Sequence, residues 1–493
     1  MSAVLFADEP SRRTSPPMPP FITPTPTPSA TPSRTGNDIP APRKYGWFVG
    51  RIFDSETRRL IAATVELHDE DGELAGGPAP ACPLWVRGTF RIRLPEGLYR
   101  LKVTKGPFYA PYKDTPYIEI SRDNPVKLDI PMTPWGNVVH EGWASFDPFV
   151  HTAMGKAVDP VPTMETTALI SEARGLDVVF LAEPWWHDPP PNIDTFDEPG
   201  KLSDLAISAS SDGIKVSTAV AYDNRPYFGH FYRLGGAAPK PVELPDDPHT
   251  PNLGYMEKAR EGGAAVVVYN PSRISAVRMS NSPWSHMTRS TALFGELYKL
   301  RAYYASELPY DLEAGAVDAI DIQTEGDWRI WVAALNAGYR VSAVSSSHAR
   351  TGINRIELPL AHNYAFVRGR PDGRKVVQAI RKGATVVAKG PFIDFRIDSQ
   401  LPGSVIAADG DTHYAHFKIF APVDGDSSIK KIELLRNGVP LQSYTADSKT
   451  PSARRSAIPA SFGCARAQAA GILSGRPTIS VVSLSQIRYT SLP

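Results

Sequence analysis

The chain has 493 residues, of which 42% are hydrophobic, and its 53 Lys and Arg nearly balance its 52 Asp and Glu. The net charge of +1 gives no overall field favouring nucleic acid or an anionic membrane, and two cysteines are too few for a disulfide framework. No apolar run approaches the roughly 18 residues that span a bilayer, so we expect about two or three globular domains and no membrane span.

The first segment, residues 1–43, contains eleven prolines interleaved with Thr and Ser. Proline fixes φ and removes backbone donors, so we expect an extended, disordered leader without a core. The leader either tethers an exported protein or is a passive spacer. Met1–Asp8 has two interpretations: the stub of a secretory signal, too short to be complete, or an ordinary disordered terminus. The export interpretation predicts a periplasmic or extracellular protein.

Residues 44–135 alternate apolar and polar side chains with turn signals between them, for example at Asp71-Gly72. This period of two predicts a small antiparallel β-sandwich. Two phrases, Gly50–Asp54 and Gly88–Tyr99, resemble the carboxypeptidase-regulatory-like modules of exported proteins. That resemblance implies a structural or binding role for the module.

Residues 136–388 alternate short apolar runs with helical patterns that end at glycine, which is typical of repeated βα units and predicts a parallel sheet or barrel. We expect helices at 163–174, 255–261, 292–303, 328–337 and 375–382, and strands at 178–182, 214–222, 264–269, 317–322 and 341–346.

The last two segments differ in composition. Residues 389–447 return to strand alternation, with an Asn437-Gly438 hairpin turn, and predict a second small β module that is incomplete at this length. Residues 448–493 hold six Lys and Arg and no acidic residue. We interpret them as a basic tail outside the folded module. The apolar residues 479–484 could still pair as one edge strand. The tail is either disordered or the product of a reading-frame change.

Polar side chains follow several of the predicted strands. In an α/β barrel, functional groups gather at the carboxyl ends of strands, and metal-dependent hydrolysis needs imidazole and carboxylate ligands that converge there. The candidates are Asp147, His151, Glu183, His230, Asn270, Asp321 and His348.

A family resemblance rests on phrases in the same regions. The run Gly142-Trp143-Ala144-Ser145-Phe146-Asp147-Pro148-Phe149-Val150-His151-Thr152 is similar to the G-W-x-x-G-D-L-H-V-H-T motif of the carbaryl-hydrolase-like (CehA/McbA) branch of the PHP (polymerase and histidinol phosphatase) metallohydrolases. Further matching phrases lie at 173–184, 229–230, 262–271, 335–348 and 380–391. The resemblance covers roughly residues 140–440. It implies a distorted PHP-type β/α barrel flanked by small all-β sandwich domains.

The ligand positions depart from the family pattern. Phe149, Pro184 and Asn270 stand where the family has histidines, while Glu183 and His348 replace aspartates. A two- or three-metal centre is therefore not expected.

Four residues could still bind metal: His151, Glu183, His230 and His348, with Asp147 orienting ligands from behind. Three imidazoles and one carboxylate suit a single Zn²⁺ or similar divalent ion, if they converge. The alternative is that they are leftover polar groups.

The sequence thus predicts a degenerate PHP/CehA-type hydrolase homologue with lost or reduced catalysis, acting as an exported binding or scaffold protein. Its expected partner is a small molecule or a protein, and not nucleic acid. The alternative hypothesis is an active single-metal hydrolase of ester, amide or phosphoester bonds.

Overall fold

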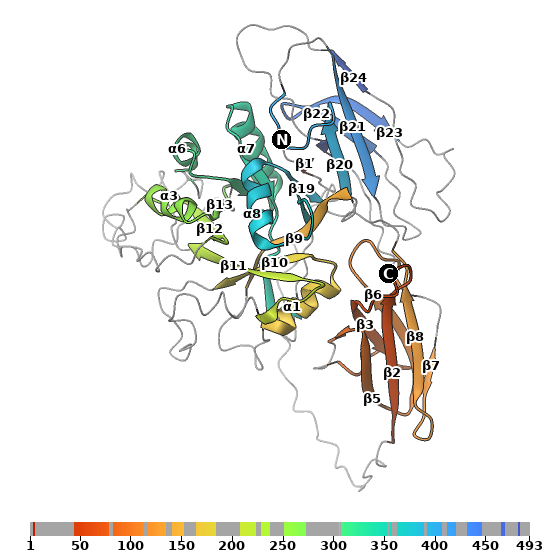
Figure 1. Ribbon diagram of the computed structural model, residues 1–493. Coiled ribbons are helices and arrows are strands. Elements are labelled where there is room, and N and C mark those ends of the chain that lie inside the picture. The colour runs from red at the N-terminus through yellow and green to blue at the C-terminus, as the bar shows by residue number, and fades with distance from the viewer. Residues whose placement is uncertain are drawn as a thin grey trace, which may run out of the picture.

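The structure is a computed structural model, and it combines a barrel-like sheet with helices and further all-β parts (Figure 1). It describes residues 3–4, 44–77, 82–112, 117–134, 141–151, 164–183, 208–222, 228–236, 251–272, 305, 307–352, 355–356, 362–388, 392–406, 412–420, 431–445, 465–468 and 482–483. No helix in these ranges is long and apolar enough to cross a membrane.

Nine strands of the largest sheet form the barrel, in the order β19-β18-β9-β10-β11-β12-β13-β14-β15. Their bounds are β9 Trp143–His151, β10 Val178–Glu183, β11 Lys215–Tyr222, β12 His230–Leu234, β13 Ala265–Tyr269, β14 Ala319–Asp321, β15 Ser342–Val344, β18 His362–Phe366 and β19 Thr385–Ala388. Strands β12 and β18 run antiparallel to both neighbours, and the other neighbouring pairs are parallel. The predicted mixed α/β fold with a barrel-like sheet is confirmed.

Side-chain hydrogen bonds bring the two ends of this sheet together. Thr385 of β19 donates through Oγ1 to the carbonyl of Ala343 in β15, at 3.0 Å. The buried amide of Asn363 in β18 accepts from the Ser345 backbone N–H at 2.6 Å and donates to the Phe146 carbonyl of β9 at 3.1 Å. The chain after β15 then continues as β16 (Ala349–Gly352), which pairs with β9 and with β17 (Arg355–Ile356). The barrel is therefore nearly closed.

Four helices match expected positions to within a few residues at each end: α1 Met164–Ala173, α3 Leu253–Glu261, α7 Glu325–Asn336 and α8 Gly373–Lys382. Helix α6, Leu308–Glu313, was not expected. Helix α7 begins with a capping box in which the Thr324 hydroxyl and the Asp327 carboxylate each accept a backbone N–H of the other residue. Helix α8 ends where Gly383 adopts a φ of +77°, as a left-handed cap requires. The helix expected at 292–303 lies outside the described residues.

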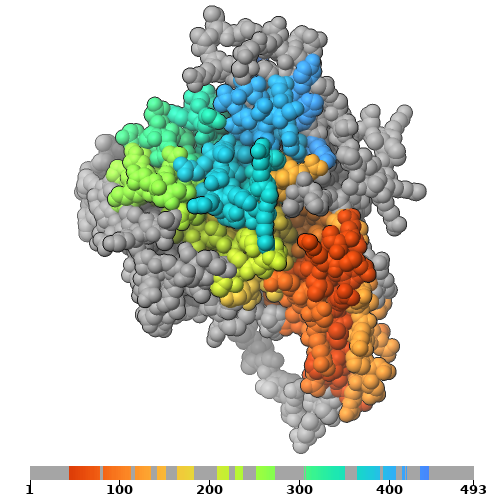
Figure 2. Space-filling model, viewed as in Figure 1, coloured from red at the N-terminus to blue at the C-terminus, as the bar shows by residue number. Residues whose placement is uncertain are grey.

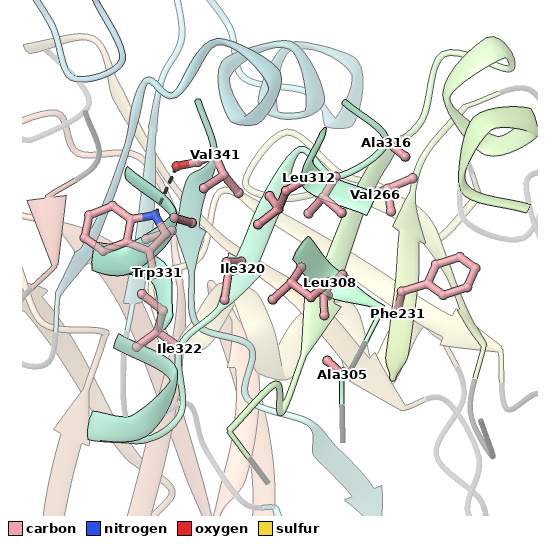
Figure 3. Packing of buried hydrophobic residues seen from close by; sticks show 14 of the residues in the cluster. Phe231, Val266, Ala305, Leu308, Leu312, Ala316, Ile320, Ile322, Trp331 and Val341 are labelled. Carbon is pink, nitrogen blue, oxygen red and sulfur yellow. Dashed lines mark hydrogen bonds between the residues drawn. The ribbon is translucent and has the colours of Figure 1, made fainter. Parts of the chain in front are cut away.

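Apolar side chains line both sides of the barrel wall. Outside, α3, α6 and α7 pack on β12 to β15, and the fully buried Trp331 donates from its indole to the Val341 carbonyl at 3.0 Å (Figure 3). Inside, residues of the strands share one cluster with residues of α8 such as Ile380. Ser342, at the start of β15, donates to the Ile380 carbonyl, so α8 covers the end where the parallel strands begin. The opposite, carboxyl end holds the predicted site residues.

The segment 44–134 forms two sheets that face each other across an apolar core. One has the order β5-β2-β8 and the other β4-β3-β6-β7, with β2 Tyr45–Asp54, β3 Ala62–His68, β4 Leu84–Arg87, β5 Thr89–Pro95, β6 Gly97–Thr104, β7 Ile118–Ile120 and β8 Val126–Met132. Arg87 donates from Nε to the buried Glu172 carboxylate of α1 at 2.8 Å, so this module is fixed to the barrel by an ion pair.

The C-terminal module contains two sheets, β20-β21-β24 and β23-β22-β25. Its strands are β20 Phe392–Ile397, β21 Thr412–Phe420, β22 Lys431–Arg436 and β23 Val439–Thr445. The predicted turn is present, with positive φ at Asn437 and Gly438. Two short tail strands, β24 (Ala465–Gln468) and β25 (Val482–Ser483), pair with β21 and β22, and β1 (Ala3–Val4) pairs with β19. One edge strand near residues 479–484 was allowed for in the tail, and β25 lies within it. The strand β24 was not expected.

Deleting residues 449–493 is expected to lower the melting temperature by only a few degrees. Within the described residues, the tail adds one strand of four residues and one of two to the edges of two sheets. The main pairs of these sheets, β20–β21 and β22–β23, form without the tail. Thermal unfolding of the shortened and full chains, measured side by side, checks this. A fall of more than about ten degrees would show that the tail is an integral layer of the module.

Candidate functional site

The site lies at the carboxyl end of the barrel, where parallel and antiparallel strands both contribute side chains. His151 ends the parallel strand β9, whereas His230 begins the antiparallel strand β12. Because β12 is reversed, the register places His230 beside Tyr269, the last residue of β13. The first residue of one strand and the last residues of others therefore meet at the same end of the barrel.

A bulge in β9 determines which of its side chains face inward. Between Asp147 and Val150, β9 contains one residue more than the facing stretch of β10 from Val179 to Leu181. Pro148 lies in this stretch, and proline, which lacks a backbone donor, is tolerated in sheets at bulges. After the bulge Phe149 belongs to the interior cluster, while Val150 packs on the outer side with α1.

Phe149 is the centre of an aromatic cluster. It is 1% exposed, and its ring centroid lies 4.9 Å from His151, 4.9 Å from His348 and 4.8 Å from Tyr232. Tyr269 lies 5.1 Å from His348 and joins the cluster to His230, whose Nδ1 is 3.2 Å from the Tyr269 hydroxyl. The structure thus brings three of the predicted site histidines around a phenylalanine and two tyrosines.

Asp321, at the end of β14, is a fully buried carboxylate that is held by several donors. Tyr232 donates to it at 3.0 Å, the Gln323 amide at 2.6 Å and the Ser346 backbone N–H at 3.1 Å. Burial alone would raise the pKa of Asp321, but the nearby charge of His348 and hydrogen bonds from Ser346 lower it below its ordinary value. The same burial, together with the Asp321 charge, raises the pKa of Tyr232 well above its ordinary value.

His348 links this carboxylate to the solvent-facing side of the site. Its Nε2 lies 3.7 Å from Asp321 Oδ2, and its side chain is 26% exposed. Its φ is +46°, and Asn270, directly after β13, has a φ of +51°. Left-handed backbone at residues other than glycine is uncommon and is often retained at functional sites. Both positions are ones at which the sequence departs from the family pattern.

Asp147 is a buried carboxyl two residues before Phe149 in β9. Its Oδ1 accepts from the backbone N–H of Phe149 at 3.1 Å and of Ser347 at 3.2 Å. Burial raises the pKa of this carboxyl to about 6, despite these hydrogen bonds. Asp147 therefore holds together the β9 bulge and the loop that carries His348.

The fit of these residues to metal ions can be tested on the structure. In the family pattern an imidazole stands at the position of Phe149, and here that space is filled by an apolar ring that contacts the two nearest imidazoles. Within the described residues, no group of three or more His, Cys, Asp and Glu side chains has the arrangement to hold a metal ion. Glu183 ends β10 at the same rim, but its side chain and Pro184 lie outside the described residues. The described residues do not fit a multi-metal centre.

Sequence reasoning missed four residues of the site: Tyr232, Tyr269, Gln323 and Ser346. Tyr269 read as an ordinary core residue of the expected strand 264–269, and Tyr232 lay in no strand that we expected. Their one available signal was a hydroxyl at an inward position, because a buried phenol usually has a hydrogen-bond partner. Gln323 and Ser346 follow β14 and β15 directly, and the rule applied to histidines and acids would have found them if it had included amides and hydroxyls.

Comparisons with known proteins give structural neighbours only. No family model matches the chain, and no curated protein matches it. A two-domain protein of Bacteroides vulgatus containing a predicted PHP-like metal-dependent phosphoesterase is 13% identical, with a TM-score of 0.37, over 62% of this chain and 85% of that one. The lesion-specific endonuclease PfuEndoQ of Pyrococcus furiosus is 14% identical, with a TM-score of 0.27, over 50% of this chain and 57% of that one.

A second endonuclease Q structure, a complex with a 27-mer duplex bearing an abasic lesion, is 14% identical with a TM-score of 0.29, over 48% of this chain and 56% of that one. A PHP-like protein is thus among the structural neighbours. At these values the function of the chain has to be inferred from its own residues.

Proposed function

We propose that this chain is a degenerate relative of the PHP/CehA-type metal-dependent hydrolases, with multi-metal catalysis lost or strongly reduced, and that it acts as an exported binding or scaffold protein. The observation that carries the proposal is Phe149, buried among His151, His348, Tyr232 and Tyr269 at the carboxyl end of the barrel. An apolar ring at this point removes a metal ligand and also occupies the space in which ligands would converge.

The chemistry explains why this loss is decisive. Metal-dependent hydrolysis needs a cation to ionise a bound water and to stabilise the oxyanion that forms. Asn270 offers only a neutral amide in place of an imidazole, and Phe149 offers no lone pair. Several other polar groups are tied into protein contacts, such as the Tyr232–Asp321 hydrogen bond at 3.0 Å. These contacts suit a rigid scaffold better than an exchangeable metal centre.

Export and a binding role are supported by the segments around the barrel. A proline-rich leader precedes a β module fixed to α1 by the Arg87–Glu172 ion pair. Modules of the type it resembles serve structural or binding roles in exported proteins.

One observation favours a second candidate, a single-metal hydrolase of ester, amide or phosphoester bonds. The rings of His151 and His348 lie 5.9 Å apart, a separation that allows two imidazoles to share one divalent ion. Asp321, 3.7 Å from His348 Nε2, is a carboxylate of the kind that orients metal-bound imidazoles. The four-ligand zinc site expected from the sequence would also need His230, which forms no three-ligand group within the described residues, and Glu183, whose side chain lies outside them.

Purified full-length protein is expected to contain well below one divalent metal per chain and to give no hydrolysis above background. Metal content by elemental analysis, together with a screen of ester, amide and phosphoester substrates with and without added Zn²⁺, checks both expectations. The double variant His151→Ala/His348→Ala should then change neither result. One metal per chain, lost together with turnover in this variant but retained in Arg329→Gln, would establish the single-metal hydrolase. Two or more tightly held metals with turnover would refute both proposals.

A further inference from the structure

The outer face of the β5-β2-β8 sheet carries a row of arginines. Side chains alternate along β2, so Phe48 and Ile52 enter the core while Tyr45, Trp47 and Arg51 lie on the opposite face. The strand β2 is at the surface of the molecule in Figure 2, where its atoms are red. Arg91 and Arg93 of β5 lie on this same outer face and are exposed.

Each of these arginines is held over an aromatic ring of β2. The guanidinium of Arg93 lies 4.9 Å from the Tyr45 centroid, and that of Arg91 lies 3.8 Å from Trp47. At the far end Phe53 is approached by Arg58 at 4.5 Å and by Arg51 at 5.4 Å. Arg58 reaches this position from a backbone with φ +60°. A stacked guanidinium keeps its edge N–H groups available and loses less side-chain entropy when it binds an anion.

The positive charge of this row is largely uncompensated. The one acidic partner within the described residues is Asp129 of β8, 3.8 Å from Arg51, in a pair whose side chains are both more than half exposed. Lys127 on β8 adds a further exposed cation in register with Val49. From Tyr45 to Phe53 the row extends about 27 Å, at roughly 3.4 Å per residue of strand.

From this geometry we infer that the outer face of the β5-β2-β8 sheet is a docking surface for an acidic polysaccharide, a linear chain with carboxylate or sulfate groups on its sugar rings. Planar guanidinium forks pair with carboxylate and sulfate oxygens, and a flat row of charges matches a linear polyanion. The surface belongs to the sandwich and is independent of the function proposed for the barrel.

The same contacts make single-stranded nucleic acid the weaker match. Proteins that bind single strands combine a basic groove with open aromatic faces on which bases stack. Here Arg91 covers Trp47 at 3.8 Å and Arg93 covers Tyr45, so those rings serve the guanidinium groups instead. Nucleic acid is therefore an outcome to be distinguished by experiment.

The test uses the full chain in low salt with four probes: polygalacturonate, heparin, neutral dextran and a poly-dT oligonucleotide. We expect binding to at least one of the two acidic polysaccharides and none to dextran. The logarithm of the binding constant should fall linearly with the logarithm of the salt concentration, because binding releases counterions. The variant Arg91→Gln/Arg93→Gln should weaken that binding by at least about tenfold. Arg91→Lys/Arg93→Lys, which keeps the charge without the fork, should lose part of it.

The matched control is Arg329→Gln/Arg374→Gln, which removes two exposed charges from α7 and α8. If it weakens binding as much as the β5 variant does, only net charge matters and the proposed surface is wrong. Binding to neither acidic polysaccharide would also overturn the inference. So would tighter binding of poly-dT that is lost in the same β5 variant. Melting curves of each variant confirm that the sandwich remains folded.

Discussion

Restoring the family ligands is expected to raise metal affinity well above that of the natural chain. The variant combines Phe149→His, Pro184→His and Asn270→His with Glu183→Asp and His348→Asp, and it should bind Zn²⁺ or Mn²⁺ at least about 100-fold more tightly than the parent. Loss of even an outer partner of a metal site costs about 10–100-fold in affinity, so replacing several direct ligands should have at least that effect. Isothermal titration with each metal measures it.

Phe149 is the substitution on which this result depends. Its ring is fully buried, so Phe149→His alone places an imidazole in an apolar space and should destabilise the fold by about 3 kcal/mol. Metal binding to the complete variant should recover part of that loss, because a ligand bound only by the folded state stabilises it. The matched control carries the other four substitutions and retains Phe149. A complete variant that folds, yet binds metal no better than this control, would show that the barrel mouth does not place these positions around one centre.

The sequence predicted β10, β11, β13, β14 and β15 because the signals of these strands are local, but it did not predict β12, β18 or β19. Apolar runs bounded by glycine gave the strands around Val178 and Val266, and Gly383 marked the end of α8. Barrel closure was not predictable in the same way. It depends on Asn363, which joins residues 146 and 345 from distant parts of the chain, and no local pattern encodes such a contact.

The sequence indicated which histidines would lie at strand ends, but it did not indicate how they would be arranged. His151, His230 and His348 were expected from strand ends, and the structure brings all three to the aromatic cluster. The β9 bulge was not expected, although Pro148 could have indicated it, and it is the bulge that turns Phe149 inward. The antiparallel direction of β12, which brings His230 to the mouth, follows from pairing between strands that single-strand patterns do not specify.

Replacing Asp311 by asparagine is expected to stabilise the protein in alkaline solution and to have little effect in acid. Asp311 in α6 is 1% exposed, and neither of its carboxylate oxygens accepts a hydrogen bond from any residue in the described ranges. Burial, and then the charge of Glu307, raises its pKa to about 8. Asparagine has a similar volume and carries no charge, so it removes the cost of a buried anion.

The sign follows from the difference between the folded and unfolded states. An unfolded aspartate titrates near pH 4, so between about pH 4 and pH 8 the folded protein holds one more proton, and its stability falls as pH rises through this range. Below about pH 4 both states are protonated and the variant should gain nothing. At pH 9 both are ionised, and Asp311→Asn should raise the free energy of unfolding by about 2 kcal/mol. Urea unfolding at pH 4 and 9, with the exposed Asp123→Asn as control, measures the difference. A gain for Asp311→Asn that is the same at both pH values would mean that ionisation of this buried carboxyl does not limit stability.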